Sequence, residues 1–139
     1  MVAANAKNNA NILYWVSVKC KRIIRSVLAF ELLGIVYRFD ITYLVKTILD
    51  LILNKDILFV ICTDLKSLYN CLVKLGTMQE KRLIIDIISI REAYKQREIA
   101  QVKWIASKLN PADFIIKSKL TNALKSLINI NKIDLQVQE

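Results

Sequence analysis

Glu31 is the acidic residue with the most unusual surroundings in the sequence. It is the only charged residue between Arg25 and Arg38, and the residues three and four positions away from it are apolar or glycine. A cation on the same helix therefore cannot pair with it. Burial of a carboxylate is costly unless a cation or a metal ion binds it. Glu31 is predicted either to form a tertiary ion pair or to bind a metal.

Asp64 and Asp113 each stand where a helix is expected to begin. Asp64 comes shortly after Ile57–Cys62, an apolar run without polar alternation, which predicts a strand buried on both faces. The loop after such a strand is a usual place for chemistry in α/β sheets. Asp113 follows Asn110-Pro111, a pair that favours a helix start. Both aspartates also suit a structural role, since an aspartate caps or stabilises the first turn of a helix.

The residue types that the chain lacks narrow the chemistry further. It contains no histidine, which excludes Cys–His zinc fingers and Ser–His or Cys–His catalysis. The three cysteines, Cys20, Cys62 and Cys71, form no Cys-x-x-Cys pair. A metal would therefore be bound through oxygen, which favours Mg²⁺ or Mn²⁺. One carboxylate on a helix, one at a strand end and one at a late helix start can converge on such an ion.

Composition indicates a single globular domain with a polyanionic partner. Of the 139 residues, 55% are hydrophobic, which is enough apolar material for a core. Another 24% are charged, and there are only 2 glycines and 1 proline, as is typical of a globular chain. The net charge of +9 suggests nucleic acid, although solubility accounts for part of it. No window reaches the ~20 apolar residues of a membrane span, and the N-terminus lacks the apolar core of a signal peptide. We expect an intracellular chain without a membrane partner.

The sequence predicts an alternation of strands and helices. Strands are expected over Asn11–Val18, Ile57–Cys62 and Ile99–Ala106, where β-branched, aromatic and apolar residues gather. Strands separated by helices imply right-handed crossovers and a parallel core, and thus an α/β class. The expected helices are Val27–Asp40 with Ser26 as N-cap, Ile41–Leu53, Lys66–Lys74, Glu80–Gln96, a segment from Pro111, and Thr121–Ile130.

Two of these helices have marked apolar patterns. Val27–Asp40 is apolar nearly all round, which predicts burial on more than one face. Ile41–Leu53 has an apolar stripe at spacings of three and four, predicted to face the core, opposite Thr42, Lys46 and Asp50. The stripe consists of Ile41, Leu44, Val45, Ile48 and Ile52.

Residues 1–9 and 131–139 are predicted to be flexible ends of the single domain 1–139.

Four short motifs follow one another along the chain: S-x-L-A-x-E-L, T-D-x-K-S-L-Y, V-K-W-I and N-P-A-D-x-x-x-K. In this combination and order they resemble the ribonuclease H domain of fungal copia-type LTR retrotransposon polyproteins, which follows the reverse transcriptase. The resemblance covers about residues 11–130, nearly the whole chain. It implies a five-stranded mixed sheet flanked by helices.

The resemblance also implies an activity and a site. The family hydrolyses the RNA strand of an RNA·DNA hybrid with two divalent metal ions, here Mg²⁺ or Mn²⁺, held by carboxylates. By resemblance, Glu31, Asp64 and Asp113 match the family's helix glutamate, strand-end aspartate and late aspartate. The implied location is cytoplasmic, in a virus-like particle, or nuclear.

The chain departs from the family at its beginning. The family's first catalytic aspartate lies on a strand upstream of the segment that matches Asn11, and the ten residues before Asn11 contain neither Asp nor Glu. The chain is therefore expected to lack the family's first two strands and to have little or no nuclease activity by itself. Asn11–Val18 could instead pair directly with the central strand.

Two other functions fit the same residues. The first is a nucleic-acid-binding relic without catalysis, whose basic residues near the expected site contact the phosphate backbone. The second is an interaction fragment that completes its sheet with the upstream reverse transcriptase polyprotein, or that self-associates through an open sheet edge. Trp15 and Trp104 are predicted to be core residues rather than base-stacking platforms. The basic residues nearest the expected site are Lys19, Lys21, Arg22, Arg25 and Lys66; Lys103, Trp104, Lys117 and Lys119 are further candidates for backbone contact.

Overall fold

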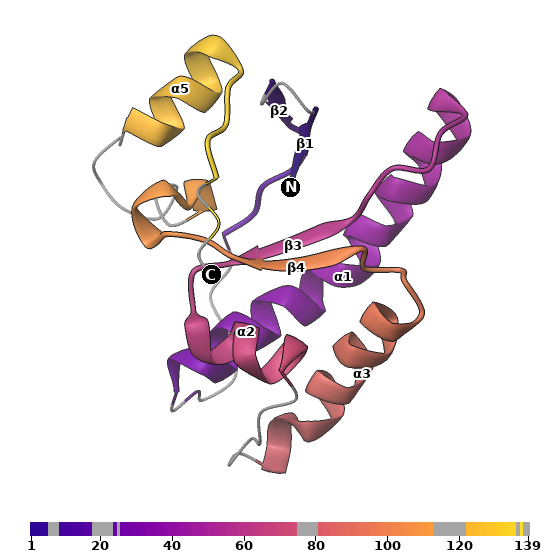
Figure 1. Cartoon of the computed structure of the whole chain (residues 1–139), viewed down its shortest axis with the longest axis vertical. Helices are drawn as coiled ribbons and strands as arrows, with labels where there is room; N and C mark the ends of the chain where they lie inside the picture. Colours follow the sequence, from indigo (N-terminus) through magenta and orange to yellow (C-terminus); the bar gives the residue numbers. More distant parts are fainter. Residues whose placement is uncertain are drawn as a thin grey trace. The chain divides into compact units, whose positions relative to one another are not determined.

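The computed structural model describes residues 1–5, 9–17, 24, 26–74, 81–112, 122–135 and 137. They form two compact units. The first unit combines residues 1–23 with residues 105–139, and the second comprises residues 24–104 (Figure 1). Each unit is described by itself below.

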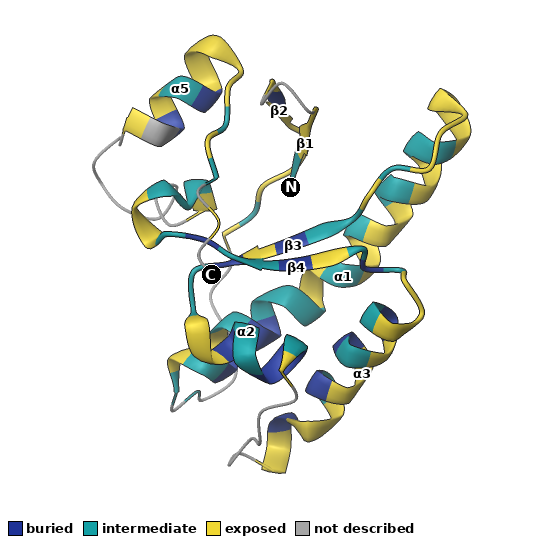
Figure 2. Ribbon diagram, viewed as in Figure 1, coloured by how far each residue is buried: buried dark blue, intermediate teal, exposed yellow. Residues whose placement is uncertain are grey.

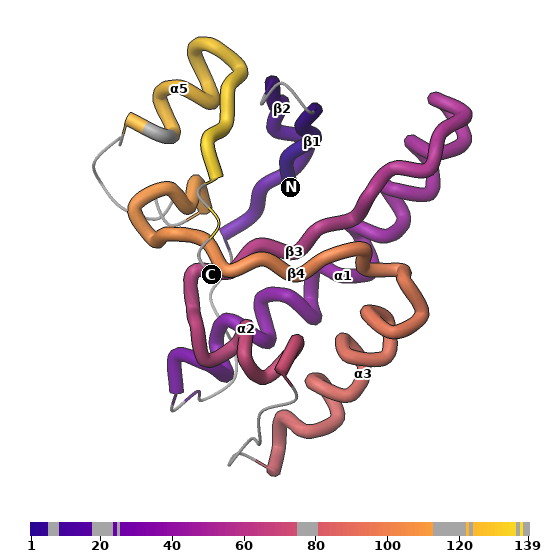
Figure 3. The backbone as a smooth tube through the Cα atoms, viewed as in Figure 1, coloured from indigo at the N-terminus to yellow at the C-terminus, as the bar shows by residue number. Residues whose placement is uncertain are grey.

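The second unit has the α/β organisation predicted from the sequence. Its two strands are parallel, with Val60 opposite Gln101 and Thr63 opposite Trp104. The chain passes from the first strand through helices to the second, as Figure 3 traces, which is the crossover that parallel strands require. The elements are α1 (Val27–Leu53), β3 (Val60–Thr63), α2 (Lys66–Val73), the 3-10 turn η1 (Lys81–Leu83), α3 (Ile84–Lys95) and β4 (Gln101–Trp104).

The core of this unit lies between the helices and one face of the β3–β4 sheet. Each helix and both strands contribute buried apolar side chains, and these pack into a single cluster (Figure 2). The hydrophobic effect therefore fixes the three helices to the sheet. The cluster consists of Ala29, Leu32, Ile61, Leu68, Cys71, Leu72, Leu83, Ile87, Ile90, Ala93, Ile99 and Val102.

Helix α1 is one continuous helix where the sequence predicted two. It begins as expected, because the Ser26 Oγ accepts a hydrogen bond from the Ala29 N–H at 3.2 Å. No glycine or proline separates Asp40 from Ile41, so nothing in the chain interrupts the helical hydrogen bonds there. The helix ends at Leu53, followed by Asn54 in the left-handed conformation at φ 49°.

The predicted burial of α1 is wrong for much of its surface. Val27 and Phe30 are exposed, so the first half of the helix is not buried all round. In the second half, Ile41, Leu44, Ile48 and Ile52 of the predicted inward stripe are exposed, and Val45 is half-buried. An apolar stripe records which residues share a face of a helix, but not whether another element covers that face.

Strand β3 is buried on one face rather than on both, as was predicted. Ile61 and Thr63 are buried, whereas Cys62 between them is exposed. Leu58, just before the strand, is exposed as well. The physical reason is that the helices of this unit join Ile61 and Val102 in one core cluster, so they cover the face of the sheet opposite Cys62. Among the described residues, β3 pairs with β4 only. The implied five-stranded sheet is thus replaced, in the part of the chain described, by two sheets of two strands each.

The first unit contains the second of these sheets. Strands β1 (Val2–Ala4) and β2 (Ala10–Ile12) form an antiparallel pair, so regular structure occurs within residues 1–9, which were predicted to be flexible. Among residues 131–139, Lys132 bridges to Asn9, and Val137 bridges to Ile105. The strand predicted at Asn11–Val18 extends only to Ile12, and its partner is β1 rather than the central strand. The unit also contains η2 (Ser107–Leu109) and α5 (Asn122–Ile130).

Candidate functional site

Asp64 lies immediately after β3, where the sequence placed it. The Thr63 Oγ1 accepts a hydrogen bond from the Leu65 N–H at 3.1 Å and thereby shapes the turn into α2. Leu65 occupies the N-cap position of α2, and no side chain caps that helix. Asp64 is therefore not the N-cap of α2, which was the structural role suggested by the sequence. Asp64 is half-buried, and among the described residues no hydrogen bond or ion pair engages its carboxylate, so its oxygens can serve as ligands.

Two motifs that are 40 residues apart in the chain meet beside Asp64. The Trp104 Nε1–H donates a hydrogen bond to the Asp64 backbone oxygen at 3.3 Å. The Lys66 Nζ lies 4.6 Å from the centre of the Trp104 ring, a cation–π contact. Asp64 and Lys66 belong to T-D-x-K-S-L-Y, and Trp104 belongs to V-K-W-I. The carboxyl ends of both parallel strands thus carry one aspartate–tryptophan–lysine cluster, defined here as Asp64, Lys66 and Trp104.

A second lysine is adjacent to this cluster in the sequence. Lys103 precedes Trp104 on β4 and is half-buried, and Lys66 is exposed. Trp104 is half-buried and Trp15 is 61% exposed, so neither is the core residue that the sequence predicted. On β3, protein atoms around the sulfur raise the pKa of the Cys62 thiol, and the positive charge of Lys103 partly offsets this. Cys62 is therefore a protonated thiol at neutral pH, not a nucleophile.

The structure describes only some of the remaining predicted site residues. Glu31 is half-buried on α1, in the same unit as Asp64. Asp113, Lys19, Lys21, Arg22 and Arg25 lie outside the described residues, as do Lys117 and Lys119. Among the residues that are described, no three acidic or cysteine side chains are grouped closely enough to hold a metal ion. The predicted three-carboxylate metal site therefore remains a prediction.

Lys46, Asp50 and Asp56 form a charged network that connects α1 to the segment before β3. This network was not predicted from the sequence. The Lys46 Nζ lies 2.6 Å from Asp50 Oδ2 and 2.7 Å from Asp56 Oδ1. Asp50 Oδ1 also accepts a hydrogen bond from the Ile57 N–H at 2.7 Å. These contacts raise the pKa of Lys46, and the hydrogen bonds from Lys46 and then Ile57 lower the pKa of Asp50. The spacing of Lys46 and Asp50 by one helical turn was the available signal.

Comparison with known proteins provides no relative. No family model, no curated protein and no solved structure matches this chain. Within the part of the chain described, no helix is long and apolar enough to cross a membrane. The features of this chain that bear on function are therefore the four motifs and the geometry at the strand ends.

Proposed function

We propose that this chain is a ribonuclease H-like domain derived from a retrotransposon polyprotein, and that it binds nucleic acid at the carboxyl ends of β3 and β4. The observation that carries the proposal is the contact between Lys66 and Trp104 beside Asp64. It brings together residues from two of the motifs on which the family resemblance depends. It also does so at the edge of a parallel sheet where α/β proteins bind ligands.

The charges near this edge favour a polyanion as the ligand. The chain has a net charge of +9, Lys66 is exposed, and Lys103 precedes Trp104 on β4. Lysine side chains bind phosphates as point charges and release counterions when they do so. By the family resemblance, the preferred polyanion is an RNA·DNA hybrid.

Binding is expected to depend steeply on salt and on Lys66. Fluorescence anisotropy with a labelled RNA·DNA hybrid should show affinity falling by tenfold or more between about 50 and 200 mM salt. Lys66→Gln should weaken binding several-fold and reduce the salt dependence. Lys81→Gln removes an exposed lysine from η1, away from the strand ends, and serves as the control. Affinity that is indifferent to salt, or equal losses for both variants, would contradict the proposal.

Divalent metal would supply the hydrolytic chemistry if the ancestral activity persists. Mg²⁺ or Mn²⁺ would be held by Glu31, Asp64 and Asp113, and the free carboxylate of Asp64 fits that role. The ion would activate water and stabilise the leaving oxygen. We propose that the isolated chain cleaves poorly or not at all, because residues 1–10 offer no acidic residue to match the family's first aspartate.

A second candidate function is favoured by the open edges of the β3–β4 sheet. Among the described residues β3 pairs only with β4, so each of the two strands has one unpaired edge. A partner that supplies further strands would pair with these edges, and the upstream reverse transcriptase segment of the polyprotein is the partner that the resemblance suggests. By the resemblance, that segment would also carry the family's first aspartate.

One cleavage assay tests both statements. A labelled hybrid incubated with Mg²⁺ or Mn²⁺ and the purified chain should remain intact, and cleavage should appear when the upstream segment is added. Asp64→Asn should abolish the restored activity. Robust cleavage by the purified chain, lost in Asp64→Asn, would refute the inactivity of the isolated chain. No cleavage in the presence of the upstream segment would count against sheet completion.

A further inference from the structure

Helix α1 has a row of exposed apolar side chains along one side, interrupted at Gly34, which is half-buried. From Val27 to Leu51 these positions follow one another at alternating spacings of three and four residues. Apart from Gly34, their exposed fractions lie between 41% for Ile41 and 77% for Leu51. We call this row the α1 seam. It consists of Val27, Phe30, Gly34, Tyr37, Ile41, Leu44, Ile48 and Leu51.

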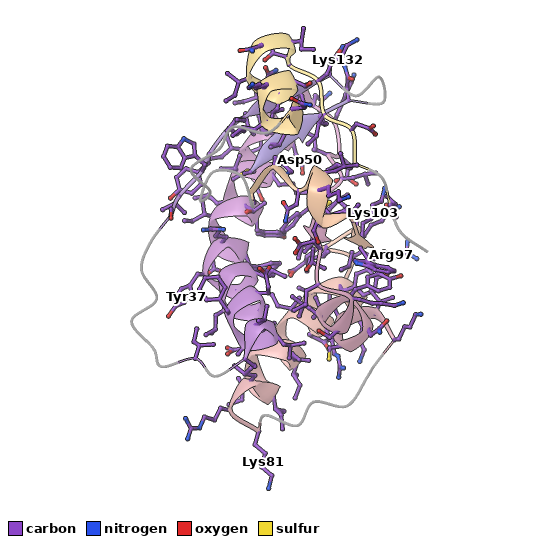
Figure 4. All side chains as sticks on the ribbon, turned by 90° about the vertical axis from the view of Figure 1, so that its left-hand side faces the viewer. Tyr37, Asp50, Lys81, Arg97, Lys103 and Lys132 are labelled. Carbon is purple, nitrogen blue, oxygen red and sulfur yellow. The ribbon has the colours of Figure 1, made fainter. Side chains whose placement is uncertain are left out.

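The seam lies on the outer side of α1, and the opposite side of the helix packs in the core. Ala29 and Leu32 are buried in the core cluster of the second unit, so α1 is anchored by the opposite face. At Gly34, an added Cβ would meet no atom within 4 Å, which shows that this step of the seam is open. Tyr37 projects outward from α1 in Figure 4. Within the described residues of the second unit, nothing therefore covers this apolar surface.

The spacing of the seam is that of a coiled coil. Alternating steps of three and four place every seam residue at an a or d position of a heptad repeat, sustained over four heptads. A sustained apolar seam of this kind can pack against another helix, because the a and d side chains of each helix insert between side chains of the other. The a positions are Val27, Gly34, Ile41 and Ile48, and the d positions are Phe30, Tyr37, Leu44 and Leu51.

We propose that two copies of this chain pair through the α1 seam as a parallel two-stranded coiled coil. In the second half of the seam, Ile41 and Ile48 occupy a positions, and Leu44 and Leu51 occupy d positions. Isoleucine at a with leucine at d is the combination that favours parallel dimers over other states. The partner is therefore a second copy of the same helix.

The charges beside the seam favour the parallel arrangement as well. Arg38 lies at an e position and Asp40 at a g position, on opposite sides of the seam. An antiparallel pair that aligns the whole seam places e against e and g against g. It would bring the two copies of Arg38 together, and likewise the two copies of Asp40. A parallel pair places g against the following e, so that Asp40 lies against Val45 of the second copy and no like charges meet.

The apolar surface available is enough for a reversible dimer. The exposed seam side chains leave on the order of 500 Å² uncovered per copy, if an aliphatic side chain buries ~100 Å² and an aromatic one ~200 Å². Two copies would together bury on the order of 1,000 Å², the lower limit for a specific interface. We therefore expect a reversible dimer rather than a permanent one.

Sedimentation velocity of the full chain over a range of concentrations tests the pairing. The wild-type chain should show a reversible monomer–dimer equilibrium. Leu44→Glu and Ile48→Glu place a charge in the seam and should each weaken dimerisation at least tenfold. Ile85→Glu changes an apolar side chain of α3 that is 79% exposed and outside the seam, and should leave the equilibrium unchanged. Circular dichroism should show equal helix content for all four proteins.

A second measurement tests the orientation. In a background with Cys20→Ser, Cys62→Ser and Cys71→Ala, the variant Asn54→Cys carries one thiol at the end of α1. Oxidation should cross-link the dimer of the parallel pair, whereas antiparallel helices would hold the thiols about 40 Å apart. A monomer at every concentration, or a dimer unaffected by Leu44→Glu, would overturn the proposal. A Leu44→Glu-sensitive dimer that does not cross-link would overturn the parallel arrangement.

Discussion

At the scale of single residues, position in the fold decides what Asp64 and Gly34 contribute. Asp64 could have been a helix cap, but Leu65 takes that position and the Asp64 backbone oxygen instead anchors the Trp104 indole. Gly34 occupies the interior of α1 without a turn or a close neighbour that requires glycine. A glycine in such a place weakens the helix, because it loses more conformational freedom on folding than any other residue.

Gly34→Ala is therefore expected to stabilise the chain by about 1 kcal/mol, the difference in helix propensity between the two residues. The added methyl group meets no atom within 4 Å, so no strain offsets this gain. Urea denaturation at a concentration where the chain is monomeric measures the effect on folding, separately from any effect on pairing. A loss of stability on this substitution would mean that a neighbour occupies the space beside Gly34.

At the scale of elements, α1 is joined to the rest of the second unit both by its inner face and near its end. Its inner face supplies Ala29 and Leu32 to the core, and its end is tied to the connection before β3 by Lys46, Asp50 and Asp56. This network closes the turn after Asn54, since Asp50 also binds the Ile57 N–H. These contacts fix the direction in which the chain runs from α1 into β3.

Asp50→Asn should lower the thermal denaturation midpoint at pH 7, because it removes the negative charge that pairs with Lys46. The hydrogen bond from Lys46 lowers the pKa of Asp50 in the folded state, so the stability it contributes is present above the ordinary value of 3.8. This contribution is lost as pH falls through the lower, folded value. The pKa of Lys46 is raised, so on the alkaline side the contribution persists to above its ordinary value of 10.5.

Melting curves of wild type and Asp50→Asn between acidic and neutral pH measure this dependence. The difference between the two midpoints should be largest near neutral pH and should shrink below pH 3.8 as wild-type Asp50 becomes protonated. A difference that is constant over the whole range would show that the charge of Asp50 does not contribute to stability, because asparagine keeps an oxygen that can accept the hydrogen bond from the Ile57 N–H.

At the scale of the whole molecule, three surfaces of the second unit carry proposed functions. The strand ends carry Asp64, Lys66 and Trp104, the β3–β4 sheet has open edges among the described residues, and α1 carries the seam. Pairing through the seam is independent of hybrid binding at the strand ends. Loss of hybrid binding in Lys66→Gln would leave pairing through the seam intact, and Leu44→Glu would leave hybrid binding to the monomer intact.

The sequence by itself predicted the features that depend on neighbouring residues in the chain. Ser26 as N-cap, helix α2 from Lys66, the α/β class and the placement of Asp64 after a strand all follow from local patterns, and the structure confirms them. Such features need only the hydrogen-bonding and conformational preferences of a few adjacent residues. The metal site of Glu31, Asp64 and Asp113 and the ribonuclease H relationship stay predictions.

The tertiary structure decided which apolar faces are covered. Ile41, Leu44 and Ile48 form the stripe that the sequence predicted, but they face solvent, and β3 is buried on one side only. It also brought Trp104 to Asp64 across 40 residues of chain. Periodicity fixes which side chains share a face, whereas burial depends on which distant elements pack there. That choice is made by the free energy of the whole assembled core, to which residues far apart in the chain contribute together.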